Sequence, residues 1–148
     1  AVTDNDGHRV YFYPRYCLNI ALYNLQRPEL VQLYSVLNGE ALSPTHPAHN
    51  FFIGRHMRNW EMICSMNWIL PTGVDEERFY DLYTLAMSAM DGLQYRWLGD
   101  DSMNLLEEWM SISDIIFPPS EWAGFTDPSE YDPAPDRCLL TFTLSARQ

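Results

Sequence analysis

The chain has 148 residues, 47% of them hydrophobic, and a net charge of −11, because 20 acidic residues stand against nine arginines and no lysine. This length fits a single domain, residues 1–148, that buries roughly 70% of the surface of its unfolded chain. No apolar run approaches the ~20 residues of a membrane span, so we expect a soluble globular protein, and so acidic a surface makes these residues poor nucleic-acid binders.

The three cysteines are far apart, odd in number and placed in apolar surroundings. This pattern favours buried free thiols in the reducing cytoplasm. No signal peptide is visible and the chain does not begin with Met, so we expect either a processed chain or a fragment of a longer one.

The first half of the chain predicts a short strand and three helices. Residues 1–9 are a polar tail, and the alternation over residues 10–13 favours a strand. Pro14 and Pro28 suit first-turn positions, which predicts helices over residues 14–26 and from 28 to about 41. A third helix is expected from Pro47 to about residue 70, capped by Thr45 or His46 and followed by a turn at 71–73.

Residues 75–98 predict the central helix, with Asp75 as its cap and Gly99 as its C-terminal glycine. Its apolar arc is wider than the ~100° stripe that covers one core, so the helix needs one partner inside the subunit and another outside it. Asp100 or Asp101 is expected to cap a last long helix. The central line of the apolar arc contains Phe79, Leu82, Tyr83, Ala86, Met90, Leu93 and Trp97.

The C-terminal part of the chain has a different composition. Five of the ten prolines lie in residues 117–137, which predicts an extended, irregular arm. Residues 138–144 alternate as a strand does. Because a lone strand leaves its backbone groups unpaired, we expect residues 10–13 and 140–144 to pair as a two-stranded ribbon.

Three short stretches together resemble a known family. They are RPELV at 27–31 leading to GEA at 39–41, then HPAH at 46–49 before Phe51, Phe52 and Arg55, and finally AMDGLQYRWL at 89–98. Their order and spacing resemble the C-terminal, ligand-binding half of the tetracycline-repressor (TetR) family of bacterial transcriptional regulators, over residues 14–117. Members of that family begin with a basic helix-turn-helix domain, and nothing here matches one.

The resemblance implies an all-α fold, an antiparallel bundle of about five helices (core about 14–117), followed by the arm and a possible short C-terminal strand over 118–148. It also implies a homodimer, formed by the last two long helices as a four-helix bundle. Operator DNA would be bound only through the missing N-terminal domain. The interface expected from the short-chained flank and the last helix comprises Leu85, Ala89, Gly92, Arg96, Trp109, Ile112 and Ile116.

Polar residues on the apolar face of the third helix are the candidate site. His49, His56 and Asn67 lie there, and buried polar groups need partners. Neighbouring carbonyls or hydroxyls could satisfy them, or they could line the pocket that the resemblance implies, suited to an apolar or amphipathic effector; the acidic chain makes a cationic ligand plausible. The expected lining is His49, Phe52, His56, Trp60, Ile63, Asn67, Tyr83, Met87 and Met90.

These observations favour the ligand-sensing domain of a TetR-like repressor that requires no cofactor. A metal site at His46, His49 and His56 lacks a cysteine or carboxylate at ligand spacing. No phosphate-binding loop, Ser-His-Asp order or Cys-x-x-Cys motif indicates an enzyme. Two alternatives stay open: a small helical enzyme pairing His56 with Asp91 or Glu61, and a dimeric interaction module without a ligand.

Overall fold

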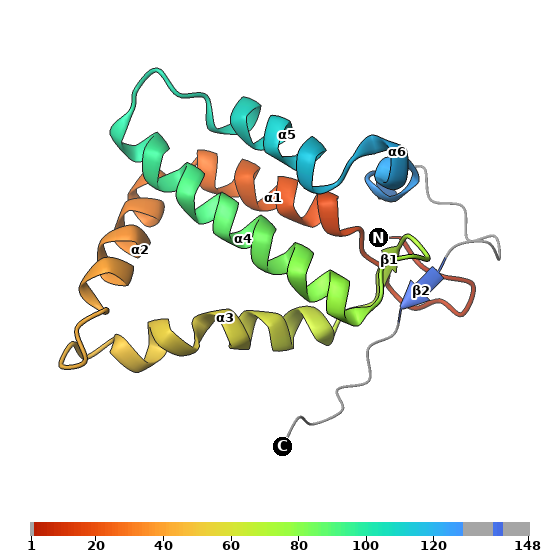
Figure 1. The fold of residues 1–148 in the computed structure, drawn as a ribbon, viewed down its shortest axis with the longest axis horizontal. Coiled ribbons are helices and arrows are strands. Elements are labelled where there is room, and N and C mark those ends of the chain that lie inside the picture. Colours follow the sequence, from red (N-terminus) through yellow and green to blue (C-terminus); the bar gives the residue numbers. More distant parts are fainter. Residues whose placement is uncertain (1, 129–137, 141–148) are drawn as a thin grey trace.

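The structure is a computed structural model that describes residues 2–128 and 138–140. This part of the chain is mostly helical, which confirms the all-α class (Figure 1). The elements run in the order α1 (Tyr13–Leu25), α2 (Pro28–Glu40), α3 (His49–Cys64), β1 (Trp68–Leu70), α4 (Glu76–Gly99), α5 (Leu105–Ile116), α6 (Pro119–Trp122), the 3₁₀ turn η1 (Ala123–Phe125) and β2 (Cys138–Leu140).

The helices form two groups that share α4: α1, α4 and α5 surround the core, and α2, α3 and α4 form a triangle beside it (Figure 1). Helix α5 packs against both α1 and α4, and α2 contacts α1 and α4. In Figure 1, α2, α3 and α4 form the three sides of a triangle, while the strands and α6 gather at the end of the molecule where α1 and α4 begin. The core lies between α1, α4 and α5 and extends to this end.

Local chemistry explains where the helices begin. Pro14 and Pro28 occupy the first turns of α1 and α2, where a missing N–H costs nothing. Asp75 caps α4 as expected, because its Oδ1 accepts a hydrogen bond from the Arg78 N–H at 2.9 Å. The cap of α5 is Asn104 and not Asp100 or Asp101, since the Asn104 Oδ1 accepts from the Glu107 N–H at 3.1 Å.

The third helix is shorter than expected. It ends at Cys64, and residues 68–70 form β1 instead of a last helical turn. All three side chains of β1 are buried, so the strand crosses the core with both faces covered. A fully buried apolar triplet cannot be told from a buried helical turn by periodicity alone, which is why the sequence misled here.

Strand β1 also corrects the expected pairing of the two terminal segments. The Tyr11 N–H donates to the Asn67 carbonyl, and the Ile69 N–H donates to the Tyr11 carbonyl. On its other side, β1 pairs antiparallel with β2, with Trp68 opposite Leu140. Within residues 2–128 and 138–140 the two terminal segments therefore lie on either side of β1 and do not pair with each other.

The region after α5 contains more regular structure than expected. Helix α6 and the η1 turn follow Pro118 directly, and Trp122 of α6 is almost fully buried against Phe117. The burial of Trp122 against Phe117 therefore holds the first residues of the expected arm in a regular structure. Residues 129–137 and 141–148, which hold the rest of that arm and most of the expected strand, lie outside the described residues.

Trp68 joins several aromatic side chains of the core. Its ring is fully buried and contacts the rings of Tyr13, Tyr16 and Phe79 at centroid distances of 5.3, 5.5 and 5.7 Å. Its indole N–H donates to the Ile63 carbonyl at 2.8 Å, which satisfies the buried donor.

Replacing Trp68 by alanine should lower the free energy of unfolding by about 3–5 kcal/mol, because it leaves a large cavity at this junction. Chemical denaturation followed by circular dichroism measures the loss. Tyr95→Ala, at a site 72% exposed, is the matched control and should change stability by less than ~0.5 kcal/mol. Equal effects of the two substitutions would contradict this account of the core.

Candidate functional site

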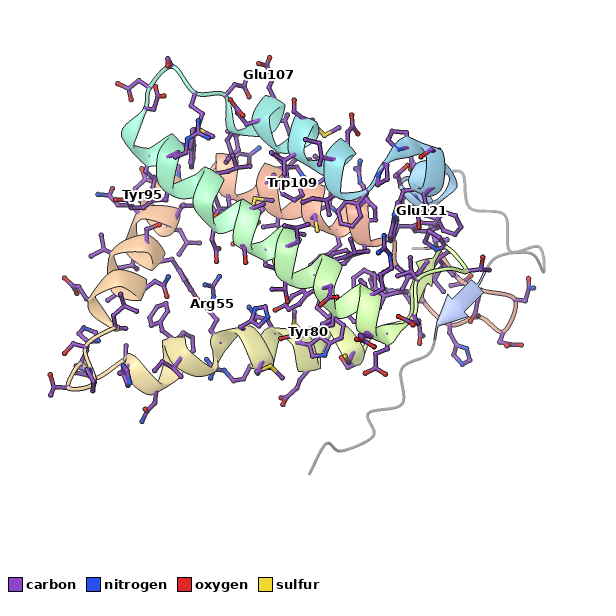
Figure 2. The ribbon with its side chains drawn as sticks, viewed as in Figure 1. Arg55, Tyr80, Tyr95, Glu107, Trp109 and Glu121 are labelled. Carbon is purple, nitrogen blue, oxygen red and sulfur yellow. The ribbon has the colours of Figure 1, made fainter. Side chains whose placement is uncertain are left out.

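A cavity of about 440 Å³ opens between the helices of the triangle. This volume lies within the range of small-molecule sites. Figure 2 shows Arg55 projecting from α3 into the space between α2 and α4, and Tyr95 near the point where α2 meets α4. The lining residues come from four helices: Asn24, Leu30, Val31, Tyr34, Ser35, Asn38, Phe51, Arg55, Arg58, Asn59, Asp91, Gln94 and Tyr95.

A smaller hollow of about 160 Å³ adjoins this cavity and reaches toward the core. Its own lining is mostly apolar or aromatic: Tyr16, Ile20, Met62, Ile63, Tyr83, Met87 and Met90. The two spaces share Asn24, Arg55, Asn59, Asp91 and Gln94. The residues that line only the smaller hollow are thus apolar or aromatic, whereas the polar residues at the junction belong to both spaces.

An ion pair lies where the two spaces meet. The Nη2 atom of Arg55 is 3.6 Å from Oδ1 of Asp91, and the two side chains are 31% and 53% exposed. The Arg55 guanidinium also lies over the Tyr34 ring, 5.6 Å from its centroid. A pair this exposed contributes about 0–1 kcal/mol to stability, so it is easily rearranged.

Gln94 is the buried polar residue of the site. It is 8% exposed, and its Nε2 atom is a buried donor without a hydrogen-bond partner among the described residues. Such a donor costs about 1–3 kcal/mol when it stays unsatisfied. Gln94 follows Met90 and Asp91 by one helical turn, so it faces the cavity together with them.

The structure divides the nine residues expected to bind a ligand. Ile63, Tyr83, Met87 and Met90 line the smaller hollow, whereas the others have protein partners elsewhere. The sharpest contrast is at Trp60, which is buried and contacts the rings of Phe79, Tyr80 and Tyr83. Its accessible edge borders a different, outer hollow beside Glu76 and Glu77.

The polar members of that set are satisfied locally. The Nδ1 atom of His49 lies 2.6 Å from the Ala41 carbonyl, and the Asn67 amide donates to the Arg9 carbonyl at 3.3 Å. His56 contacts the Thr84 hydroxyl at 3.2 Å and stacks on Tyr83. Phe52 packs against Phe51 and Tyr34.

The cavity borders residues of α3 that were not expected to bind a ligand. Arg55, Asn59 and Met62 lie along one helical face, and all three line one or both spaces. The sequence did offer a signal at Gln94, a polar residue inside the apolar arc of α4 between Met90 and Trp97. A polar residue in an apolar arc indicates a buried side chain that needs a polar partner.

The structure also sorts the residues expected at a dimer interface. Leu85 is 53% exposed, Gly92 and Arg96 are exposed, and Ala89 and Ile112 are partly buried. Trp109 and Ile116 are buried inside the protomer, which corrects their assignment to the interface. Both belong to the stripe that packs α5 onto α1 and α4. Met110 and Ile115, 44% and 76% exposed, are apolar residues that α5 presents outward.

The three histidines considered as a weak alternative metal set have separate partners. The His46 Nδ1 atom accepts from the Ala48 N–H, and His49 and His56 have the separate partners given above. Asp4, Asp6 and His8 come together in the N-terminal loop, where Asp4 Oδ1 accepts from the N–H groups of Asp6 and His8. These internal hydrogen bonds account for that cluster without an ion.

Comparisons with protein-family models, curated proteins and solved structures find no match for this chain. The described helices include none with both the length and the apolar character that a bilayer crossing requires. The cavity and its chemistry are therefore the basis for a functional assignment.

Tyr83 should make stability depend on alkaline pH. Burial raises the pKa of its phenol to about 12, and the hydroxyl donates to the His56 carbonyl at 3.0 Å. Between pH ~10 and ~12 the unfolded chain loses this proton while the folded protein keeps it, so the free energy of unfolding should fall as pH rises.

The measurement is denaturation of wild type and Tyr83→Phe at pH 8 to 12. The stability advantage of wild type over the variant should shrink across this window, because only wild type carries the Tyr83 proton. Phenylalanine keeps the ring and lacks the titrating hydroxyl, so the comparison isolates the Tyr83 phenol, and no lysine interferes. A constant difference from pH 8 to 12 would show that Tyr83 has an ordinary pKa.

Proposed function

We propose that this chain is the ligand-sensing and dimerisation domain of a TetR-like transcriptional repressor. The observation that carries the proposal is the pair of adjoining spaces between α1, α2, α3 and α4, lined by Gln94, whose Nε2 has no hydrogen-bond partner among the described residues. A site with an apolar interior and a few convergent polar groups is typical of a small-molecule pocket. The ligand of such a pocket is an amphipathic molecule.

The order of the helices supports the same proposal. The stretches that carry the family resemblance lie on α2, α3 and α4, the three sides of the cavity. Asp91, Gln94 and Tyr95, which belong to the stretch at 89–98, line it. The resemblance and the cavity therefore coincide in the same part of the chain.

Helix α4 suggests how ligand binding reaches a partner subunit. One face of α4 carries Asp91 and Gln94 in the cavity, and another presents Leu85 and Gly92 to the outside. A ligand that prefers one position of α4 shifts the population toward it and thereby changes the geometry of the dimer. A DNA-binding domain outside these 148 residues would translate that change into operator affinity.

The proposed dimer is tested by Gly92→Arg. A Cβ atom added at Gly92 would meet no described atom within 4 Å beyond its chain neighbours and its own helix backbone, so we expect the substitution to spare the fold while placing a charged side chain in the interface. We expect wild type to have the mass of a dimer by light scattering at micromolar concentration and Gly92→Arg to have that of a monomer.

Gly39→Arg is the matched control, because Gly39 is also helical and equally open but lies on α2 away from the proposed interface. It should leave the dimer intact. A monomeric wild type, or equal masses for wild type and Gly92→Arg, would overturn dimerisation through α4.

Ligand sensing is tested by a thermal-shift screen of chemically diverse amphipathic molecules against wild type and Ser35→Trp. Ser35 lines the larger cavity, so a tryptophan there occupies it. A true ligand raises the melting temperature of wild type by mass action and loses its effect in Ser35→Trp.

Gln32→Trp places the same side chain at an exposed position of α2 outside the cavity lining and should keep the shift. The proposal fails if no compound stabilises wild type. It also fails if the stabilising compounds act equally on Ser35→Trp.

A further inference from the structure

We propose that the cavity selects an amphipathic carboxylate, with the carboxylate held by Arg55 and Arg58 and the apolar part directed into the smaller hollow. This inference rests on the proposed ligand-sensing function and names the class of its ligand. It reverses the expectation from whole-chain charge, which made a cation plausible.

The local charge of the cavity is opposite to that of the chain. Of the residues lining the larger cavity, Arg55 and Arg58 are cations and Asp91 is the sole acid. The site thus carries two of the nine arginines of a protein with a net charge of −11. A local excess of positive charge in a concave site attracts anions, and the planar guanidinium matches the geometry of a carboxylate.

Both arginines retain donors for a ligand. Arg55 approaches Asp91 at 3.6 Å, which is longer than the 2.7–2.9 Å of a charge-assisted hydrogen bond, and it makes no hydrogen bond to another described residue. Arg58 donates through Nη2 to the Phe51 carbonyl and lies over the Phe51 ring at 4.7 Å. That contact holds the side chain at the cavity while leaving most of its five donors free.

Gln94 discriminates between ligand classes by its hydrogen-bonding requirement. Gln94 lines both spaces, and its buried Nε2 has no acceptor among the described residues. A turn of the terminal amide would present this donor to a carboxylate or carbonyl oxygen, whereas an ammonium group supplies no acceptor. The one acid of the lining, Asp91, already faces Arg55. The donors of the site that still lack an acceptor therefore favour a ligand with acceptor oxygens.

The smaller hollow accounts for the apolar part of the ligand. Ile63, Met87 and Met90 line it, and its volume of about 160 Å³ suits a short alkyl chain or one aromatic ring. Methionine side chains adapt to either shape. The arginines and Gln94 thus recognise the head group, whereas the hollow sets the size of the tail.

The test measures the affinity of two matched series of probes by isothermal titration calorimetry. The alkyl series is octanoate, octylamine and 1-octanol. The aromatic series is 4-phenylbutyrate, 4-phenylbutylamine and 4-phenylbutanol. The carboxylate of at least one series should bind wild type at least about tenfold more tightly than its amine and alcohol. Its affinity should fall as salt rises, because the contacts are ionic.

Three variants assign the contacts. Arg55→Gln, Arg58→Gln and Gln94→Met should each weaken carboxylate binding about tenfold or more, because each removes a donor to a carboxylate oxygen. Arg78→Gln removes one positive charge from an exposed position of α4 outside the cavity and should bind as wild type does. Melting curves without ligand establish that every variant is folded.

The outcomes separate this inference from the function it rests on. Tighter binding of an amine or an alcohol that Ser35→Trp blocks would overturn the carboxylate assignment and leave ligand sensing in place. Carboxylate affinity equal in wild type, Arg55→Gln and Arg58→Gln would overturn it as well. Binding of no probe in either series would also overturn it, whereas the broad screen decides ligand sensing itself.

Discussion

The burial of Trp68 is the constraint on which the rest of the architecture depends. Its indole N–H donates to the Ile63 carbonyl at the end of α3, and its ring packs on Tyr13 of α1 and Phe79 of α4. One side chain therefore ties together the beginnings of two helices and the end of a third. The backbone around Trp68 is paired on both sides. Asn67 and Ile69 form hydrogen bonds with Tyr11 on one side, and β2 pairs with β1 on the other. A buried aromatic residue with every polar group satisfied is a rigid anchor.

The position of this anchor determines which face of α3 lines the cavity. Because the chain must turn after Cys64 to bring β1 into the core, Ile63 and Trp60 are drawn inward beside it. The 100° step of the helix then directs Arg55 and Asn59 toward the space enclosed by α2 and α4. The polar character of the cavity is thus a consequence of where α3 ends. An α3 continuing to residue 70 would bury different residues.

Helix α4 has three different faces, whereas a simple amphipathic helix has an apolar and a polar one. Its inner face must pack on α1 and α5, and next to that face it supplies Asp91 and Gln94 to the cavity. The arc beyond carries the exposed Leu85 and Gly92. The Gln94 Nε2 atom, which has no hydrogen-bond partner among the described residues, lowers stability at this position.

The helical class and the starts of α1, α2 and α4 follow from the sequence, because proline positions, the Asp75 cap and 3.6-residue periodicity act locally. Four of the residues expected to bind a ligand, Ile63, Tyr83, Met87 and Met90, line the smaller hollow, and their role in binding stays a prediction. The placement of β1 between the terminal segments, and of Arg55, Arg58 and Gln94 around one cavity, follows from tertiary packing. Pairing between distant segments and the direction of a polar face depend on what each element packs against, and local sequence does not encode that choice.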